Sequence, residues 1–516
     1  MSFTEAHYVT QNGAGLHTGR NVANAWSVTE FQNSANWSTY NSVDGKIGPG
    51  DVVYFSGNFT SRPTVMLGGN ANGSVTLDGF EAGETDPVHT INTGTALLTQ
   101  GMEVGNGTAG PDYLTIQDFR MTRTNSTLPG FRLYGAYGNS LERVIVRRNY
   151  VYQTYGTLFY YYRGRYCIIE DNKFINFGQG GTNATQGVNF IETHNTLVRR
   201  NIFGHSRALY PDGCTSANMV ELHGCNSMLL EYNDIYGAPN QSGVATKEHA
   251  TPNRYIVYRF NKVHKNNSDH EGRGLGFNNR VETPHQDFYV YGNYLVDNFV
   301  CGLMVGKATS NLYVWANIIS NNHRAGIVVW ENSTNLNFIN NTIARNNIAN
   351  DSDITRGGIS IAKGSTINIK NNIFWNNSPG SPSGRRHQVV SYVPLTSLEH
   401  NRYYHDGGAP TFYYNSAYRD LAYLKSIGFE NATPAGSIIN PLFVSPSGLD
   451  GIHGTVDDNY RLSSSSTLIN AGKTLTGSFS VNLSGGDSWF ETNSGYGTLN
   501  FGYDDAIDPV LTDWTT

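Results

Sequence analysis

The chain has 516 residues and a formal net charge of -6, and only 15% of its residues are charged. This balance argues against a nucleic-acid-binding protein, because such a protein needs a basic face for the phosphates. No stretch approaches the ~20 consecutive apolar residues of a membrane-spanning helix, so we expect no membrane partner either. The 57 glycines, 32 tyrosines and 24 phenylalanines favour an all-β chain that is rich in turns.

The four cysteines do not predict a metal site, because Cys167, Cys214, Cys225 and Cys301 lack CxxC and Cys/His spacings. Cys214 and Cys225 are close enough in sequence for a local disulfide, and buried free thiols are the alternative. The amino terminus, MSFTEAHYVTQNGAG, has no basic segment followed by an apolar run and therefore shows no signal peptide. We expect an extracellular or a virion-associated protein, and the sequence does not choose between the two.

The first predicted element is a short helix near the amino terminus. Ser27 and Glu30 in SVTEFQNSANW have the spacing of a capping box, in which each side chain bonds to the other residue's backbone. Such a helix can cover the open end of a stacked core. GPGDVVYF, residues 48–55, then predicts a turn that enters a strand. We therefore expect an N-terminal cap over residues 1–50.

The next elements repeat along the chain. Nine segments combine alternating apolar residues with an asparagine and a further apolar residue, as in VIVRRNYV and CIIEDNKF. Their asparagines are Asn149, Asn172, Asn201, Asn233, Asn261, Asn293, Asn317, Asn341 and Asn372. Apolar alternation indicates strands, and a repeat of about 24 residues is too short for a βαβ unit. We predict one coil of a β-solenoid per repeat, with turns in which Asn adopts a left-handed backbone and bonds to neighbouring coils.

A second apolar strand follows each asparagine turn and a variable loop, and it usually opens with glycine. Examples are GVNFIE, GVATKE, GLGFNN, GLMVGK, GIVVWE and GISIAK. This regularity resembles the right-handed parallel β-helix superfamily, which includes pectate lyases, polysaccharide lyases, polygalacturonases and phage tailspikes. The resemblance implies an all-β, right-handed parallel β-helix with a groove over residues 51–400, followed by a C-terminal cap and tail over residues 401–516. One fold of this kind hosts many reactions.

In each of these second strands the residues at positions two and four are apolar and should point inward, so positions three and five should point outward. This register places Glu221, His223, Lys247 and Asn278 on one outward face over three consecutive coils. Related enzymes bind saccharides on this strand, so we expect a substrate groove there. The expected substrate-binding residues are Tyr161, Asn189, Asn278 and Trp330 on the strands, and Asp212, His270, Glu271 and Arg324 in the adjoining loops.

The favoured reaction is β-elimination on an acidic polysaccharide, in which a base removes the proton next to a uronate carboxylate. We predict Lys247 as the base and His223 as the acid or a second base. Arg273 would neutralise the carboxylate and lower the pKa of Lys247 by crowding it. Glu221 would orient these groups or bind a metal.

This arrangement resembles the lyase family that contains alginate lyases and chondroitinase B. Lys247 matches the basic lysine of that family, whereas Asn278 stands where the family has an assisting arginine. Gln241 and Ser242 replace the acidic pair that binds calcium in the family. The resemblance therefore leaves calcium open as a cofactor and implies no metal ligand in this chain.

Two further functions remain as alternatives. A glycoside hydrolase needs two carboxyl groups at a set separation, and Glu221 with Asp212 or Glu271 would supply them. A non-catalytic saccharide-binding protein, such as a tailspike, would use the aromatic residues Tyr161 and Trp330 alone. Spikes are often oligomeric, and the chain has no coiled-coil heptads that would indicate an oligomer.

Overall fold

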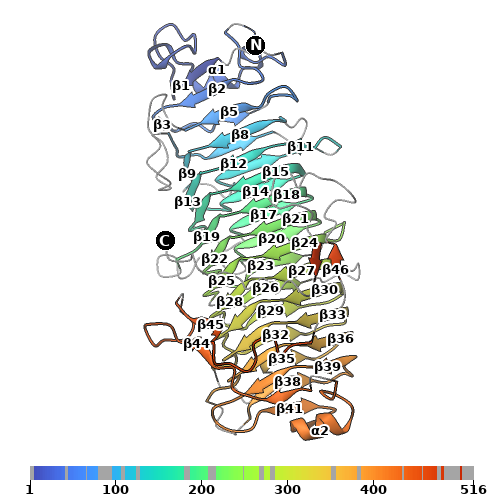
Figure 1. Cartoon of the computed structure of the whole chain (residues 1–516). Helices are drawn as coiled ribbons and strands as arrows, with labels where there is room; N and C mark the ends of the chain where they lie inside the picture. Colours follow the sequence, from blue (N-terminus) through green and yellow to red (C-terminus); the bar gives the residue numbers. More distant parts are fainter. Residues whose placement is uncertain are drawn as a thin grey trace. The chain divides into compact units, whose positions relative to one another are not determined.

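The computed structural model describes residues 5–473 apart from 41–42, 44, 66, 80–95, 106–110, 124–127, 137, 179–185, 207–216, 248, 267–271, 279–284, 350–355, 381–384, 433–434 and 456, together with residues 478–480 and 500–502. These residues form two compact units that divide between Asp234 and Ile235. In each unit most of the described strands belong to three long parallel sheets, and Figure 1 shows them stacked as successive rungs.

In the first unit the three sheets take one strand from each coil in turn. The first sheet contains β1 (Ala6–Val9), β2 (Val52–Phe55), β5 (Val75–Asp78), β8 (Leu114–Gln117), β12 (Ile145–Arg147), β15 (Gly164–Glu170), β18 (His194–Arg199) and β21 (Asn226–Glu231), and β11 (Leu141–Glu142) pairs with β15. The second contains β4 (Thr64–Val65), β7 (Met102–Val104), β10 (Phe131–Tyr134), β14 (Phe159–Tyr162), β17 (Val188–Ile191) and β20 (Val220–His223). The third contains β3 (Asn58–Phe59), β6 (Leu97–Leu98), β9 (Arg120–Arg123), β13 (Tyr150–Thr154), β16 (Lys173–Ile175) and β19 (Ile202–Gly204).

The second unit repeats this pattern, and β22 (Asp234–Tyr236) contains the division between the units. Its first sheet contains β24 (Arg254–Arg259), β27 (His285–Tyr291), β30 (Thr309–Trp315), β33 (Thr334–Ile339), β36 (Ser365–Lys370) and β39 (Ser397–Glu399). Its second contains β23 (Ser242–Lys247), β26 (Arg273–Asn278), β29 (Cys301–Val305), β32 (Ala325–Val329), β35 (Gly357–Ile361), β38 (His387–Ser391), β41 (Thr411–Tyr414) and the antiparallel β42 (Ala417–Arg419). Its third contains β25 (Lys262–His264), β28 (Tyr294–Val296), β31 (Ile318–Ser320), β34 (Thr342–Ala344), β37 (Ile373–Trp375), β40 (Arg402–Tyr404) and β43 (Ser437–Ile438).

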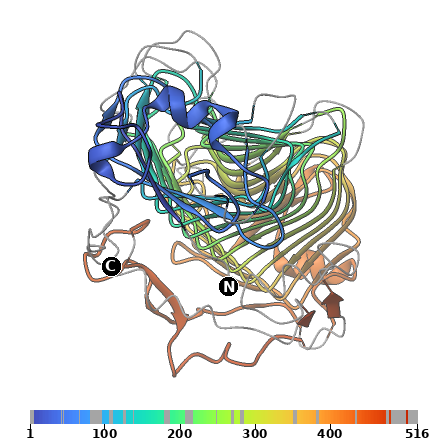
Figure 2. The same cartoon turned by 90° about the horizontal axis from the view of Figure 1, so that it is seen from above.

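The core of each unit is a set of columns of inward-facing side chains. Val146, Ile169 and Val198 occupy one position on three consecutive strands of the first unit, and all three are fully buried. Leu303 and Ile327 form a similar column in the second unit. Burying each such side chain stabilises the fold by about 1.5–3 kcal/mol. Seen from above, the strands of successive coils run side by side within each unit (Figure 2).

The predicted capping helix is present as α1 (Val28–Gln32), between the short 3-10 helices η1 (Val22–Asn24) and η2 (Ser34–Asn36). Ser27 and Glu30 form both hydrogen bonds of the capping box. Phe31 packs its ring edge-on against Phe55 of β2, so α1 covers the first coils of its unit. A second α-helix among the described residues is α2 (Leu421–Ser426). No helix in the described part of the chain has the length and hydropathy needed to cross a membrane.

The asparagine ladder predicted from the repeats is confirmed within each unit. Asn149, Asn172, Asn201 and Asn233 form it in the first unit, where each backbone N–H donates to the Oδ1 of the next asparagine at 3.0 Å. In the second unit it runs through Asn261, Asn293, Asn317, Asn341, Asn372 and Asn401. It ends on Glu430, whose buried carboxylate accepts from both the backbone and the side chain of Asn401.

The prediction that the ladder asparagines adopt a left-handed backbone is wrong. The left-handed backbone belongs to the residue before each ladder asparagine, such as Arg148, Asp171 and Arg200, and not to the asparagine itself. The ladder asparagines are there because their buried amides satisfy backbone groups of the turn. Asn172, for example, also donates to the carbonyl oxygens of Val146 and Glu170. An unsatisfied buried backbone group costs about 1–3 kcal/mol, which explains the strict repeat.

A second asparagine ladder was not predicted. It lies in the second unit, five residues after the first ladder on each coil, and comprises Asn266, Asn298, Asn322, Asn346 and Asn377. In the first unit the residues five positions after the ladder asparagines are Thr154, Phe177 and Ser206. The residue five positions after Asn233 is Ala238, which belongs to the second unit. Asparagine at this second spacing was visible in the sequence, and it marks a second buried turn.

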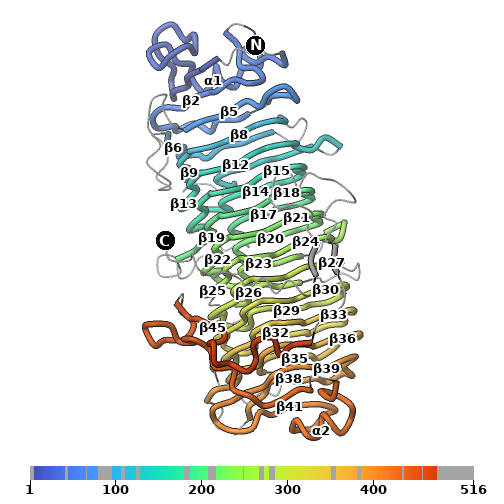
Figure 3. The backbone as a smooth tube through the Cα atoms, viewed as in Figure 1, coloured from blue at the N-terminus to red at the C-terminus, as the bar shows by residue number. Residues whose placement is uncertain are grey.

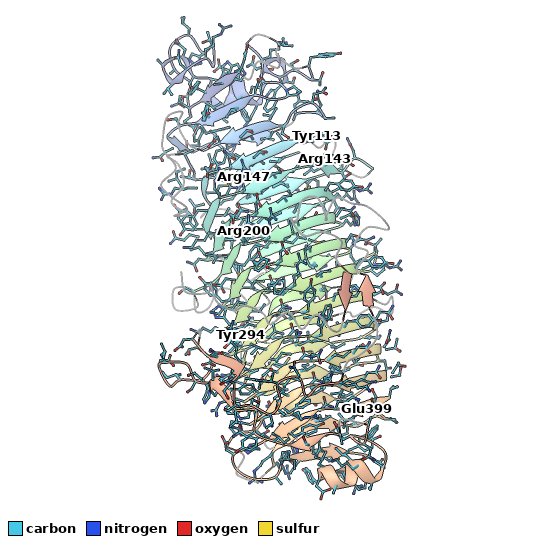
Figure 4. The ribbon with its side chains drawn as sticks, viewed as in Figure 1. Tyr113, Arg143, Arg147, Arg200, Tyr294 and Glu399 are labelled. Carbon is cyan, nitrogen blue, oxygen red and sulfur yellow. The ribbon has the colours of Figure 1, made fainter. Side chains whose placement is uncertain are left out.

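The chain returns along the third sheet of the second unit after β43, where β44 (Phe443–Ser445) and β45 (Asn459–Leu462) form an antiparallel pair (Figure 3). We call β44, β45 and the described residues between them the strap. Phe443 and Tyr460 of the strap pack against Trp375 of β37. Tyr294 of β28, labelled in Figure 4, donates its hydroxyl to the carbonyl of Thr455 at 3.2 Å. The apolar patch formed by Tyr294, Val296, Ala344 and Trp375 on the outward face of this sheet is therefore covered by the chain itself. The remaining described strands are β46 (Ser478–Ser480) and β47 (Asn500–Gly502).

The strap should depend on pH through Asp458. Burial raises the pKa of Asp458 from 3.8 to about 6, because its carboxylate loses solvation beside Tyr460, Asp457 and the strap backbone. Asp458 therefore holds its proton more tightly in the docked strap than in the free chain. The stabilisation of the docked strap by this protonation is fully present below pH 3.8 and is lost as the pH rises through 6. We expect Asp458→Asn to slow amide hydrogen exchange in β44 and β45 at pH 7.5 and to change it little at pH 4.

His453 in the strap acts in the opposite direction. Burial lowers the pKa of His453, so this histidine favours docking of the strap at higher pH. The charge of Arg345 acts on Asp458 as well. Taking the difference between the wild-type protein and Asp458→Asn isolates the single carboxyl group. Faster exchange in the variant at pH 7.5 would show that the ionised carboxylate holds the strap in place.

Candidate active site

The outward face of the second sheet carries the predicted site, and its register is confirmed on two strands of the first unit. Val188 and Phe190 of β17 align with Val220 and Leu222 of β20, and all four are fully buried. The alternate residues therefore face outward, with Asn189 beside Glu221 and Ile191 beside His223. Neighbouring strands lie about 4.8 Å apart, so these four side chains form one compact patch.

The prediction that Tyr161 faces the groove is wrong. Tyr161 aligns with the inward residue Phe190, is fully buried, and places its hydroxyl against the Sγ of Cys167. A shift of one residue moves a side chain to the other face of a strand. Leu158 stands where the next coil has Gly187, so the glycine that marks the strand start in other coils is missing here. Tyr160 and Tyr162 take the outward positions instead.

Glu221 and His223 are in direct contact. The Oε2 of Glu221 lies 3.1 Å from the Nε2 of His223, and the two side chains are 3% and 20% exposed. The other carboxylate oxygen, Oε1, accepts a hydrogen bond from the Nδ2 of Asn218 at 2.9 Å. A buried carboxylate thus fixes a half-buried imidazole on the outward face. This geometry is typical of a carboxylate that orients a histidine for proton transfer.

Tyrosine and arginine side chains continue the face toward β10. The rings of Tyr134 and Tyr162 stack with centroids 5.0 Å apart, and the Arg132 guanidinium lies 4.2 Å from the Tyr134 centroid. Arg163 lies 4.5 Å from the Tyr162 ring centroid and forms an ion pair with Glu192. Its hydrogen bond with Glu192 raises the pKa of Arg163. Arg132 is likewise paired, with Glu103 at 2.9 Å, so this face presents tyrosine rings and two arginine–glutamate ion pairs beside the Glu221–His223 pair.

In the second unit Lys247 ends β23, and its Nζ donates to the Oε1 of Gln241 at 3.3 Å. Lys247 aligns with Asn278, as predicted, whereas Ser242 aligns with Arg273. Arg273 is five residues before Asn278, which places it about 16 Å along the strand from the level of Lys247. The prediction that Arg273 crowds Lys247 is therefore wrong. Arg273 begins β26, whereas Asn278, the residue level with Lys247, ends it.

Arg273 instead lies beside Cys301 on the neighbouring strand. Burial raises the pKa of the Cys301 thiol to about 12, and the charges of Arg273 and Arg324 oppose that rise. Cys167, Cys225 and Cys301 are all buried free thiols. Cys214, the expected partner of Cys225, lies outside the described residues.

Trp330 and Arg324 lie at opposite ends of β32. The Trp330 side chain is 48% exposed just after the strand, in agreement with its predicted exposure. Arg324 precedes the strand, and its guanidinium lies 5.5 Å from the centroid of the Phe299 ring. The two residues therefore do not form one contact site in the second unit.

Three predicted loop residues, Asp212, His270 and Glu271, lie outside the described residues. The described side chains hold no cluster of three or more His, Cys, Asp or Glu residues with the geometry of a metal site. Calcium therefore stays a prediction. Sequence reasoning missed Asn218 and Gln186, because a single amide three residues before Glu221 has no motif that distinguishes it from the many turn asparagines.

Comparisons with known proteins agree with the fold. Residues 129–343 match the family model described as right handed beta helix region. The fold is a right-handed parallel β-helix, as predicted. A search of curated proteins found none that matches the chain.

Similar solved structures include pectate lyase Pel9A, with 13% identity, a TM-score of 0.36, and coverage of 92% of this chain and 93% of that chain. The tailspike protein of E. coli bacteriophage HK620 has 11% identity and a TM-score of 0.43, and the match covers 75% of this chain and 71% of that chain. The catalytic unit of a GH87 alpha-1,3-glucanase from Streptomyces thermodiastaticus has 12% identity and a TM-score of 0.42, with 83% and 69% covered. At these values the likeness concerns the fold alone.

Proposed function

We propose that this chain is a carbohydrate-active enzyme that cleaves an acidic polysaccharide by β-elimination on the outward face of β14, β17 and β20. The contact between Glu221 and His223 supports this proposal, because a buried carboxylate that orients an imidazole is an arrangement for proton transfer. A polysaccharide of this kind is met outside the cell, so we also propose an extracellular or virion-associated location.

In the proposed reaction His223 removes the C5 proton of the uronate, the C4–C5 double bond forms as the C4–O bond to the leaving sugar breaks, and the leaving oxygen takes a proton from the imidazolium or from water. Glu221 keeps the imidazole in the orientation that this step needs. The Nε2 of His223 faces Glu221, so the proton from the substrate would go to Nδ1. The Arg132 and Arg163 guanidiniums lie on the same face, where they pair with Glu103 and Glu192, and they would be the groups that contact the carboxylates of a substrate. Lys247 remains a proposal as a base and is tested by its own variant, Lys247→Ala.

Hydrolysis receives less support. Glu221 is engaged by Asn218 and His223, and its expected partners Asp212 and Glu271 lie outside the described residues. Saccharide binding without cleavage is the second candidate function. The observation that favours it is the row of outward tyrosines, Tyr134, Tyr160 and Tyr162, because tyrosines provide flat apolar faces with hydroxyl groups for sugars.

The test is incubation of the full-length protein with a panel of uronate polysaccharides and neutral glycans. Elimination creates an unsaturated uronate with ultraviolet absorbance and a new reducing end, whereas hydrolysis creates the reducing end alone. We expect both signals on at least one uronate polysaccharide and neither on neutral glycans. Reducing ends without absorbance would favour the hydrolase. Saturable binding with neither signal would favour the saccharide-binding protein.

A further inference from the structure

We propose that Asn218 is a positioning residue that fixes the orientation of His223 through Glu221, and that Gln186 in turn fixes Asn218. The chain of contacts lies within the first unit, beside β17 and β20. It rests on the proposed function only in its catalytic consequence, because the orientation of the imidazole can be measured in the absence of a substrate.

The contacts form one continuous path. The backbone N–H of Asn218 donates to the Oε1 of Gln186 at 2.6 Å, and the Nδ2 of Asn218 approaches the same oxygen at 3.4 Å. The same Nδ2 donates to the Oε1 of Glu221 at 2.9 Å, and the Oε2 of Glu221 lies 3.1 Å from the Nε2 of His223. Gln186, Asn218 and Glu221 are 7%, 0% and 2% exposed, so water does not replace these bonds readily.

The orientation of the Asn218 amide is determined by its neighbours. An asparagine amide can usually be placed either way round, and only the hydrogen-bond partners decide between the two. Both groups that face Nδ2 here, the amide oxygen of Gln186 and the carboxylate of Glu221, are acceptors. The opposite orientation would place the Oδ1 of Asn218 against two oxygens, so the side chain must donate.

The donated bond has a consequence for His223. It holds one oxygen of Glu221 toward Asn218 and leaves the other directed at Nε2 of the imidazole. An ionised carboxylate only accepts hydrogen bonds, so the ring carries its proton on Nε2. The tautomer with the proton on Nε2 is thereby selected. In this account Asn218 acts through Glu221 and does not touch the substrate.

The matched variant is Asn218→Asp, which keeps the size of the side chain and replaces the donating nitrogen by an acceptor. We expect nitrogen-15 NMR of histidine-labelled protein to show the Nε2-protonated ring for His223 in the wild-type protein and a different proton distribution in Asn218→Asp. The His223 signals are identified by their loss in His223→Gln. Gln186→Leu, which removes the acceptor for Asn218, should give a smaller change in the same direction.

The control is Asn201→Ala, which removes a buried asparagine of the same unit on the ladder turn, where it contacts Asn172 and Asn233 rather than Glu221. It should lower thermal stability and leave the His223 signals unchanged. On a cleaved substrate Asn218→Asp should lower kcat at least tenfold with little change in KM, because a misplaced imidazole affects the reaction and not substrate binding.

An unchanged ring tautomer in both Asn218→Asp and Gln186→Leu would overturn the positioning role. A changed tautomer in Asn201→Ala would also overturn it, since a general loss of structure would then explain the effect. A protein that cleaves nothing but shows the expected tautomers would refute the proposed function while leaving the positioning role standing.

Discussion

Replacing His223 with glutamine is expected to lower kcat for polysaccharide cleavage by about 10²- to 10⁴-fold, the usual contribution of a positioned acid or base. Glutamine fills similar space and can still donate to Glu221, but it cannot accept the substrate proton. KM should change little, because Tyr160 and Tyr162 remain on the outward face. The measurement is steady-state kinetics on the polysaccharide that the wild-type protein cleaves fastest.

The matched control is His17→Gln. His17 and Glu30 also form a His–Glu pair, with Nδ1 and Oε2 2.8 Å apart, but both side chains are more exposed and belong to the N-terminal cap. Its kcat should equal that of the wild-type protein. Wild-type kcat in His223→Gln, or an equal loss in both variants, would contradict the assignment of His223.

Replacing Asn317 with alanine is expected to lower the free energy of unfolding by about 3 kcal/mol. Its side chain donates to the carbonyl oxygens of Val290 and Trp315, and accepts from Asn293. The variant removes the side-chain donor of these two carbonyls and the acceptor of the Asn293 backbone N–H, and it breaks the ladder at its middle. Urea unfolding followed by far-ultraviolet circular dichroism measures the loss in the cooperative transition that includes the second unit.

Asn368→Ala is the control for the ladder. Asn368 lies on the outward face of β36, where it donates to Asn337 at 3.0 Å and accepts from Ser397 at 2.8 Å. These bonds join side chains to side chains and satisfy no backbone group, so their loss should cost at most about 1 kcal/mol. Equal losses in Asn317→Ala and Asn368→Ala would show that backbone satisfaction is not what the ladder provides.

The fold could be predicted because the repeat appears at two levels of the sequence. Asparagine at one fixed place in nine segments predicted the turn. Glycine near the start of strands of the second sheet, such as Gly243 in β23 and Gly326 in β32, predicted where these strands begin. Glycine is required there because a Cβ at Gly326 would lie 2.6 Å from the carbonyl oxygen of Gly358 on the next coil. Both signals follow from contacts between coils that every coil must repeat.

The site was harder to predict because it departs from that repeat. The predicted register of β14 was shifted by one residue, because Leu158 stands where other coils have the glycine that marks the strand start. The shift exchanged the inward and outward faces for Tyr161 and its neighbours. The outward residues Glu221 and His223 were found because alternation is intact in VELH. Asn218 was missed because its role depends on the three-dimensional placement of Gln186, which lies 32 residues earlier.

The strap was also beyond the reach of the sequence pattern. The carboxyl-terminal segment was expected to be a cap and tail, but nothing in INPLFVSP indicated that Phe443 would cover Trp375. Contacts between a tail and an outward sheet face carry no period. The apolar residues on that face, such as Val296 and Ala344, are the one signal that could have suggested a cover.

The most direct test of the account is the appearance of unsaturated uronate, followed by ultraviolet absorbance, in the wild-type protein and in Glu221→Gln on the same polysaccharide. The account predicts steady product formation by the wild-type protein and a large loss in Glu221→Gln, because the carboxylate that orients His223 is then neutral. Wild-type rates in Glu221→Gln would contradict the assignment of this pair as the catalytic centre. Reducing ends that form without any absorbance would contradict elimination itself.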